Sequence, residues 1–188
     1  MTSREMKFNN FACRYAEELK VAFTKTIYDV VFNEQLFAAF DKIRRCRGTV
    51  WLIGNGGSAA LASHMATDLQ LGGVRAMALT DVAAITTIGN DERFQDVFTS
   101  QLARLAKKGD VLIAISGSGT SPNIVEATHW ACDNGLDVIG MAGFKGGTMK
   151  THTLLHVKAD EMGIAQDLEQ ILLHIISYYL ISLVRGES

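Results

Sequence analysis

Short apolar runs alternate with segments of helical periodicity over most of the chain that follows residue 48. The runs cover residues 49–53, 74–79, 110–115, 137–142 and 154–157. Most of them hold aliphatic or β-branched residues in near-continuous order, which is typical of strands that are covered on both faces. The helical segments between them cover residues 58–71, 92–107 and 121–134. This alternation predicts right-handed crossovers and an α/β fold with a doubly wound, mostly parallel sheet.

Helical periodicity without strands marks both ends of the chain. Up to about residue 46, apolar residues recur every three or four positions in two series: Phe8, Phe11, Tyr15, Leu19 and Phe23, then Leu36, Phe40 and Ile43. These series predict two helices, whose apolar faces would suit either another subunit or the core of the same chain. A long last helix is predicted over residues 165–184. Its apolar run is interrupted by His174 and Ser177 and is shorter than the roughly 20 residues of a membrane span, which favours a buried helix.

Composition narrows the class of protein. A chain of 188 residues with 48% hydrophobic residues and one proline is typical of one compact domain. The net charge of −2, with no basic run, argues against nucleic acid and membrane surfaces as partners. Residues 1–10 lack the apolar segment of a signal peptide, and the three cysteines lack metal-like spacing, so we expect reduced thiols and a cytoplasmic location.

Two loops rich in glycine and hydroxyl groups follow the first and third predicted strands, at the sheet edge where ligands bind in such folds. The first loop reads Gly54-Asn55-Gly56-Gly57-Ser58. The second reads Ser116-Gly117-Ser118-Gly119-Thr120-Ser121. Glycine lets the backbone approach a ligand closely, and free N–H groups at a helix start attract anions. Together the loops predict a site for one phosphoryl group, which hydroxyl donors hold without lysine charge.

The first loop has two other interpretations. Its spacing Gly54-x-Gly56-x-x-Ala59 matches a dinucleotide fingerprint in which Asp81 would hold a ribose. A plain strand-to-helix turn would also need these glycines. The hydroxyl-rich second loop favours a monophosphate over a dinucleotide. The chain contains no Gly-x-x-x-x-Gly-Lys-Ser/Thr motif, which argues against a nucleoside triphosphatase.

Polar side chains on two predicted helices are candidates for acid–base chemistry or metal binding. His64 and Asp68 are four residues apart and share one helix face, and Gln166 and His174 are eight residues apart on the last helix. Each alone has an ordinary explanation, such as a hydrogen-bonded histidine or a solvated carboxylate. Together they match the nitrogen and oxygen ligands of zinc sites. Glu169 and Gln170, which lie between the last pair, are further polar candidates.

The loops and the order of elements resemble the sugar isomerase (SIS) domain family, and more narrowly its phosphoheptose isomerases. The likeness is carried by both loops, by Gly89-Asn90-Asp91 and by a histidine on the helix after the first loop. It implies one flavodoxin-like SIS domain over residues 1–188, with residues 1–47 used in oligomer packing. It also implies an aldose–ketose isomerase that converts D-sedoheptulose 7-phosphate to D-glycero-D-manno-heptose 7-phosphate through an enediol, for surface-polysaccharide precursors.

The resemblance assigns roles to individual residues. It implies binding of the sugar phosphate by Asn55, Gly56, Gly57, Ser58, Asn90, Asp91, Ser116, Gly117, Ser118, Ser121 and Gln166. It makes Asp68 and His174 the proton-transfer groups. It implies a zinc ion held by His64, Asp68, Gln166 and His174. It further implies a homotetramer whose active sites lie between subunits.

Three departures from the family pattern keep other functions open. The family has glutamate where Asp68 stands, and the shorter side chain would set the carboxylate back by about an ångström, a displacement that matters for catalysis. The connection from Leu71 to Val74 is shorter than usual, and the family has histidine where Glu169 stands. A non-catalytic SIS module that binds a sugar phosphate or a protein partner is therefore an alternative, and a nicotinamide-dependent oxidoreductase is another.

Overall fold

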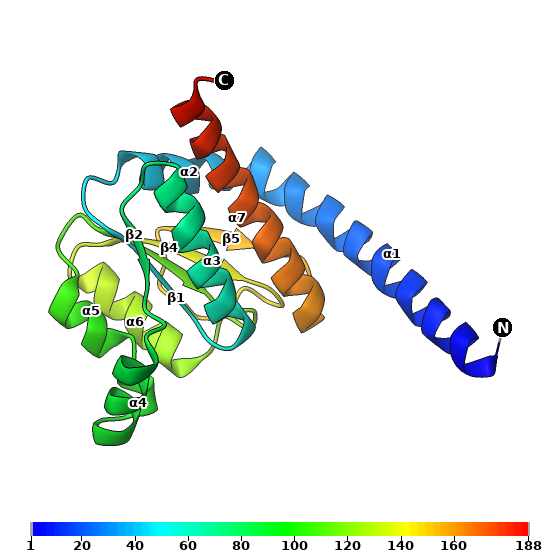
Figure 1. The fold of residues 1–188 in the computed structure, drawn as a ribbon, viewed down its shortest axis with the longest axis horizontal. Coiled ribbons are helices and arrows are strands. Elements are labelled where there is room, and N and C mark those ends of the chain that lie inside the picture. Colours follow the sequence, from blue (N-terminus) through cyan, green and yellow to red (C-terminus); the bar gives the residue numbers. More distant parts are fainter. Residues whose placement is uncertain (1, 188) are drawn as a thin grey trace.

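A single parallel sheet organises the computed structural model, which describes residues 2–187 (Figure 1). Its strands are β1 (Val50–Gly54), β2 (Ala76–Ala78), β3 (Val111–Ile115), β4 (Asp137–Ala142) and β5 (Thr153–His156). All neighbouring strands pair in parallel, in the order β2-β1-β3-β4-β5. This order confirms the predicted doubly wound, flavodoxin-like sheet. Because the winding reverses between β1 and β3, the carboxyl ends of these two strands form the crevice where ligands bind in such sheets.

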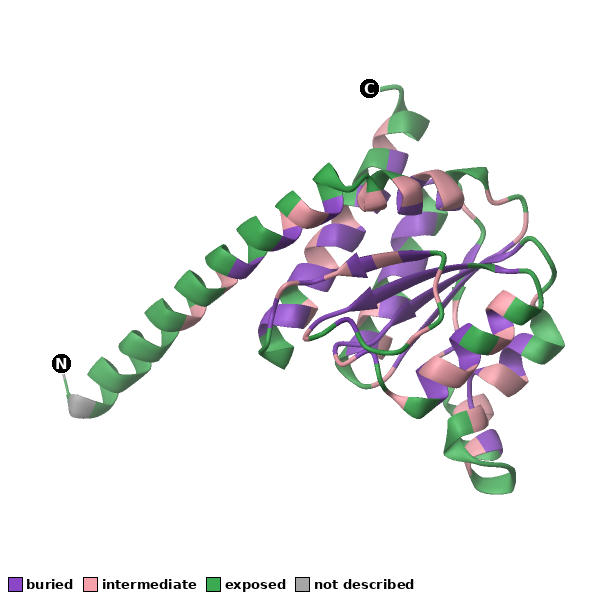
Figure 2. Ribbon diagram, turned by 180° about the vertical axis from the view of Figure 1, so that it is seen from behind, coloured by how far each residue is buried: buried purple, intermediate pink, exposed green. Residues whose placement is uncertain are grey.

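Helices cover both faces of the sheet, so its strands are largely buried (Figure 2). One face packs against α1 (Ser3–Phe32), α2 (Gln35–Arg45), α3 (Gly57–Leu71) and α7 (Met162–Arg185). The other face packs against α5 (Thr99–Leu105) and α6 (Pro122–Asp133). Successive strand residues point to opposite faces, so Leu52 joins the first apolar cluster and Ile53 the second. This two-sided burial explains the continuous apolar runs in the sequence.

The segment between β2 and β3 differs from prediction. One helix over residues 92–107 was expected, but the structure has α4 (Val82–Asp91), a 3₁₀ turn η1 (Phe94–Asp96) and α5. Helix α4 starts where the side chain of Asp81 accepts a hydrogen bond from the N–H of Ala84 at 2.8 Å. The chain then bends so that the adjacent residues Val97 and Phe98 are both buried. The prediction of one helix was wrong, because the buried apolar residues of this segment lie on either side of a bend and do not form one face of a continuous helix.

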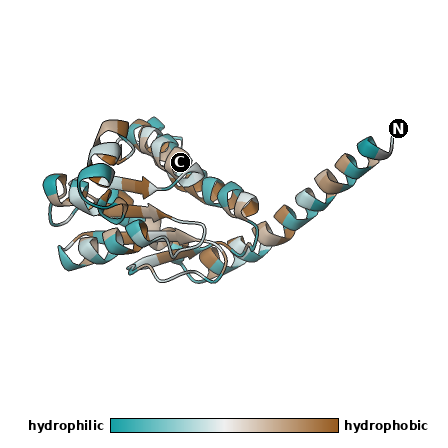
Figure 3. Ribbon diagram, turned by 90° about the horizontal axis from the view of Figure 1, so that it is seen from below, coloured by the Kyte–Doolittle hydropathy of each residue, from teal (hydrophilic) through white to brown (hydrophobic). Residues whose placement is uncertain are grey.

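The first half of α1 extends away from the body of the molecule (Figures 1 and 2). Its apolar side chains Phe8 and Phe11 are 69% and 54% exposed, whereas Ala22 and Val30 in the second half are buried in the core. Apolar positions recur along the extended part (Figure 3). The predicted pair of N-terminal helices is therefore confirmed, and a single chain covers the apolar stripe of α1 only in part.

Helix α7 is, among the described residues, the one helix long and apolar enough to cross a membrane by length and composition. Core helices of globular proteins meet the same criteria. The side of α7 that packs on the protein body is buried at Ile164, Ala165, Leu168, Glu169, Leu172, Leu173, Ile176, Ser177 and Leu180. This burial agrees with the predicted core helix.

A carboxyl group without a partner lies inside this buried face. Glu169 is fully buried, and neither of its carboxyl oxygens has a hydrogen-bond partner among the described residues. Burial raises the pKa of Glu169 to about 8, because the charged form loses its hydration without gaining a partner. The group is therefore mainly neutral at pH 7.

We expect Glu169→Met to stabilise the protein more at pH 8 than at pH 5. The pKa of this carboxyl is near 4.5 in the unfolded chain and about 8 in the folded one. As pH rises between these values, ionisation favours the unfolded state by about 1.4 kcal/mol per pH unit. Urea denaturation at both pH values measures the gain, with exposed Glu161→Met, at the N-terminal end of the same helix, as the control. Equal gains at both pH values would contradict the buried neutral carboxyl.

Candidate active site

A pocket of about 220 Å³ lies where the loops after β1 and β3 meet. It is lined by Asn55, Ser58, Ile115, Ser116, Gly117, Ser118, Ser121, Met162 and Gln166. The two loops that the sequence predicts around one phosphoryl group thus border the same pocket. Met162 and Gln166 reach it from the first turns of α7. Gly56 and Gly57 lie beside the pocket at the start of α3 and are exposed.

Two asparagines join these loops. The side-chain amide of Asn55 donates to Oδ1 of Asn123, and the amide of Asn123 donates to Oδ1 of Asn55, both at 2.9 Å. Asn123 is 2% exposed, and its Oδ1 also accepts from the N–H of Ile124. The side chain of Asn55 is therefore occupied by a structural contact. Asn123 is not among the residues predicted from the sequence, where its only signal is an amide in the first turn of the helix after the second loop.

The second loop is shaped by contacts with the loop between β4 and β5. Gly119 has a φ of +66°, and a Cβ at this position would lie 2.7 Å from the carbonyl oxygen of Gly146. The N–H of Thr148 donates to the carbonyl of Gly119, and the N–H of Gly143 donates to that of Gly117, both at 2.9 Å. Glycine is thus required at Gly119 for the close approach of the two backbones.

Helices α3 and α7 lie side by side and pack closely along much of their length (Figure 1). A Cβ on Gly57 would lie 2.5 Å from the amide nitrogen of Gln166. At the other end of α3, a Cβ on Gly72 would lie 2.9 Å from the Cβ of Leu180. The two helices therefore approach closely at Gly72, and the amide of Gln166 lies against Gly57, so the polar residues that α3 directs toward α7 come into direct contact with it.

His64 and Asp68 of α3 meet His174 of α7 between these helices. Oδ2 of Asp68 lies 3.6 Å from Nε2 of His64 and 3.8 Å from Nε2 of His174. The side chain of Asp68 is only 12% exposed. In a tetrahedral zinc site with bonds of about 2.0–2.2 Å, neighbouring ligand atoms lie roughly 3.3–3.6 Å apart. The three ligand atoms lie within 4.8 Å of one another, somewhat wider than this spacing, and their nitrogen and oxygen donors are those that zinc binds.

Two further residues of α7 contact this cluster. The hydroxyl of Ser177, which is fully buried, donates to Oδ2 of Asp68 at 3.5 Å. The amide nitrogen of Gln170 lies 2.7 Å from Nε2 of His174. The sequence analysis noted Gln170 only as a polar candidate and assigned no role to Ser177. Both follow the helical spacing from His174, at minus four and plus three residues, which is the signal that could have identified them.

Three other residues singled out from the sequence, Asp81, Asn90 and Asp91, lie on or next to α4 and not in the pocket of the two loops. Asn90 and Asp91 are the exposed last residues of α4, and the amide of Asn90 donates to Asp91 at 2.7 Å. Helix α4 projects from the body (Figure 1), and neither residue lines the pocket of the two loops. Asp81, the candidate ribose ligand, is used as the cap of α4. This use weakens the dinucleotide interpretation.

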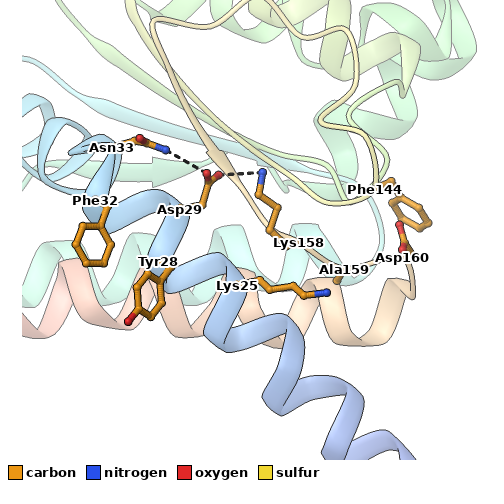
Figure 4. Close-up of a pocket in the computed structure, with 9 residues that line it drawn as sticks. All are labelled: Lys25, Tyr28, Asp29, Phe32, Asn33, Phe144, Lys158, Ala159 and Asp160. Carbon is orange, nitrogen blue, oxygen red and sulfur yellow. Dashed lines mark hydrogen bonds and ion pairs between the residues drawn. The ribbon is translucent and has the colours of Figure 1, made fainter.

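A larger groove, of about 730 Å³, lies between α1 and the segment around residue 159 (Figure 4). Its charged groups are partly paired with each other, because Asp29 binds Lys158 at 2.9 Å and accepts from Asn33 at 3.1 Å. None of the predicted site residues lines it. We therefore place the site at the smaller pocket, where the two loops converge, and along α3 and α7 toward the imidazole–carboxylate cluster about two helical turns away.

Comparison with known proteins identifies relatives that cover most of the chain. Residues 34–143 match the sequence model of the family described as SIS domain. The phosphoheptose isomerase of Helicobacter pylori (strain HPAG1) is 38% identical over 139 residues, which are 69% of this chain and 72% of that protein. The phosphoheptose isomerase of Escherichia coli O139:H28 is 34% identical over 146 residues, 74% of this chain and 76% of that protein.

Solved structures agree with these sequence relatives. The phosphoheptose isomerase of Neisseria gonorrhoeae superposes with a TM-score of 0.84 at 34% identity, over 92% of this chain and 98% of that chain. The phosphoheptose isomerase of Francisella tularensis superposes with a TM-score of 0.84 at 31% identity, over 96% of this chain and 98% of that chain. The fold is thus shared with these proteins over more than nine tenths of this chain.

We expect Asn123→Ala to lower the free energy of unfolding by about 1–3 kcal/mol, because it leaves the amide of Asn55 without a buried partner. It should also reduce the rise in melting temperature that inorganic phosphate produces, because the two loops lose their connection. Urea denaturation and melting curves with phosphate measure both effects. Asn134→Ala, which removes an exposed amide contact at the other end of α6, is the control. A variant that matches this control would show that the asparagine pair does not organise the site.

Proposed function

This chain belongs to the SIS domain family and, within it, to the phosphoheptose isomerases, and we propose that it converts D-sedoheptulose 7-phosphate to D-glycero-D-manno-heptose 7-phosphate. One structural observation supports this reaction. Gln166 and Ser58 line the phosphate-sized pocket, and the same two helices bring Asp68 within 3.8 Å of His174. A phosphate site and an acid–base pair that lie about two helical turns apart along α7 match the two ends of a sugar phosphate.

The phosphoryl group binds in the pocket between the two loops. Hydroxyl groups of Ser58, Ser116, Ser118 and Ser121 surround this pocket. The N-terminal ends of α3 and α6 also begin at these loops and favour a negative charge. Short hydrogen bonds and helix ends thus replace the lysine or arginine that many phosphate sites use.

The carbonyl end of the sugar extends along α3 and α7 toward Asp68 and His174. One group of this pair removes a proton from C1 of the ketose while the other protonates O2, which gives an enediol. Return of a proton to C2 and loss of the proton from O1 then give the aldehyde at C1. Both groups must lie within hydrogen-bond reach of neighbouring atoms, and their separation of 3.8 Å suits this exchange.

Zinc is the cofactor that we propose for this site. His64, Asp68 and His174 supply two nitrogen donors and one oxygen donor within 4.8 Å of one another, and an amide of α7 supplies the fourth. A zinc ion held there would stabilise negative charge on the oxygens of the enediol. The family pattern assigns the amide to Gln166.

The alternative functions receive less support. A non-catalytic module was suggested by the short side chain of Asp68, yet this carboxylate is near both imidazoles. The relatives with the same fold and 31–38% identity are phosphoheptose isomerases.

Free thiols at Cys13, Cys46 and Cys132 support a cytoplasmic enzyme.

We further propose a homotetramer with active sites between subunits. Exposed apolar side chains on α1 and an apolar hollow formed by α1, α2 and α7 support this assembly, since large apolar patches mark protein contacts. The hollow, of about 220 Å³, is lined by Val31, Leu36, Phe37, Phe40, Ile175, Ile176 and Tyr179. Asn90 and Asp91, which lie outside the pocket of their own chain, would contact the sugar of a neighbouring subunit.

We expect the purified protein to convert sedoheptulose 7-phosphate to the aldose, and His174→Ala to lower turnover by about 10²–10⁴-fold, because it removes a proton-transfer group. Product formation by NMR measures both. His129→Ala, which removes an exposed histidine of α6, should keep normal turnover. Binding of the ketose without turnover by the wild type would support the non-catalytic module instead.

We expect the wild type to sediment with about four times the chain mass of 20.5 kDa, and Phe8→Glu/Phe11→Glu to give smaller species. The substitutions place charge on the exposed apolar stripe of α1. Lys7→Glu, which adds negative charge on a neighbouring exposed position, is the control and should leave the mass unchanged. A monomeric wild type would contradict the proposed assembly.

A further inference from the structure

The turn over residues 143–147, which follows β4, lies directly behind the second loop of the phosphate pocket. The N–H of Gly143 donates at 2.9 Å to the carbonyl of Gly117, and Gly117 lines that pocket. The carbonyl oxygen of Gly146 leaves no room for a Cβ on Gly119, which would lie 2.7 Å from it. The second loop therefore rests on this turn, and the position of the turn sets the position of the loop.

Phe144 gives the turn its shape and has an unusual backbone conformation. Its φ of +47° lies in the left-handed region, which side chains other than glycine rarely adopt. Such a residue persists only where surrounding contacts fix it. The N–H of Phe144 donates to the carbonyl of Ala159 at 2.8 Å, and its own carbonyl oxygen lies 2.9 Å from Nε2 of His156. Both polar groups of Phe144 are thus bound by the segment at and after β5.

The imidazole of His156, the last residue of β5, is bound at both ring nitrogens. A carbonyl oxygen can only accept, so Nε2 carries the hydrogen and donates to Phe144. Nδ1 then has the free lone pair, which accepts from the ammonium group of Lys158 at 2.9 Å. The ring also lies against the turn, because a Cβ on Gly146 would lie 3.8 Å from Cε1 of His156. One imidazole therefore contacts the turn at two places in a fixed orientation.

Lys158 connects this imidazole to α1. Its ammonium group lies 2.9 Å from Oδ2 of Asp29, as Figure 4 shows. Its backbone N–H donates at 2.9 Å to the hydroxyl of Thr26, a residue that is 1% exposed. Asp29 accepts in addition from the amide of Asn33. The orientation of Lys158 is therefore set by α1, and an unbroken series of contacts leads from α1 to the turn behind the phosphate pocket.

We propose that His156, oriented by Lys158, is a positioning residue of the phosphate site. By binding the carbonyl of Phe144, it keeps the turn of residues 143–147 against Gly117 and the rest of the second loop. His156 does not line the pocket, so it acts through the loop and not on the phosphoryl group. The proposal rests on the proposed phosphate site. Loss of this side chain leaves every hydroxyl donor in place and loosens the loop that carries them.

Phosphate affinity of the full-length protein, measured by calorimetric titration with inorganic phosphate, tests this role. We expect His156→Ala to weaken binding by about fivefold, as the loss of one hydrogen bond would. His156→Gln should restore the affinity, because its amide can donate to Phe144 and accept from Lys158. His152→Ala is the matched control: it removes a histidine just before β5 that accepts from the N–H of Val138, and it should leave phosphate affinity unchanged.

Steady-state turnover of sedoheptulose 7-phosphate gives a second measurement. His156→Ala should raise KM by the same factor and leave kcat unchanged, because the proton-transfer groups lie on α3 and α7. A fall in kcat with an unchanged KM would overturn the positioning role. Phosphate binding in the expected pattern by a protein without turnover would keep the positioning role and remove the isomerase function.

Phosphate affinity in His156→Ala equal to that of His152→Ala would overturn the proposal, and so would a folded His156→Gln that fails to restore binding. A wild type that binds no phosphate would overturn it too, whereas turnover by that protein would leave the isomerase function standing. Circular dichroism shows whether each variant is folded. If His156→Ala is not, Lys158→Met, which leaves the imidazole in place, should still weaken phosphate binding, and unchanged affinity in that variant would contradict the proposal.

Discussion

The close packing of α3 against α7 is the constraint on which the rest of the site depends. Glycine is required at Gly72, at the end of α3, because the Cβ of Leu180 on α7 leaves no space for another Cβ there, and at the start of α3 the amide of Gln166 lies against Gly57. Between these contacts, Asp68 lies near His174, although its side chain is short. A displacement of about an ångström between reacting groups can cost roughly 10²-fold in rate. The helix contact therefore sets both the stability of this face and the geometry of the acid–base pair.

The site combines two parts that the fold holds by different means. The phosphate end is built from loop backbone and hydroxyl groups at the reversal between β1 and β3, and the reciprocal amide contact of Asn55 and Asn123 joins the two loops. The chemical end is built from side chains on helices. Polar groups inside an apolar helix such as α7 are costly without partners. His174 and Ser177 have such partners, whereas the carboxyl of Glu169 has none among the described residues.

The departure of Asp68 from the family pattern becomes understandable in this arrangement. The carboxylate keeps contact with two imidazoles and also accepts from Ser177, so the shorter side chain is integrated into a complete set of contacts. The exposed apolar face of α1 has no such internal explanation, and a second subunit would cover it.

The sequence by itself determined the sheet, most helices, both loops and the pairing of His64 with Asp68. These features depend on apolar spacing and on local composition, which can be read along one segment of chain. The sequence did not predict the structure between residues 82 and 107. Three short elements stand there in place of one helix, because the side chain of Asp81 caps a helix at its start and the chain bends where two adjacent residues are buried. Only the tertiary structure decided that Asn123 binds Asn55 and that Ser177 of α7 contacts Asp68 of α3. The distance and rotation between two helices, or between two loops, arise from packing that no periodicity along a single segment specifies.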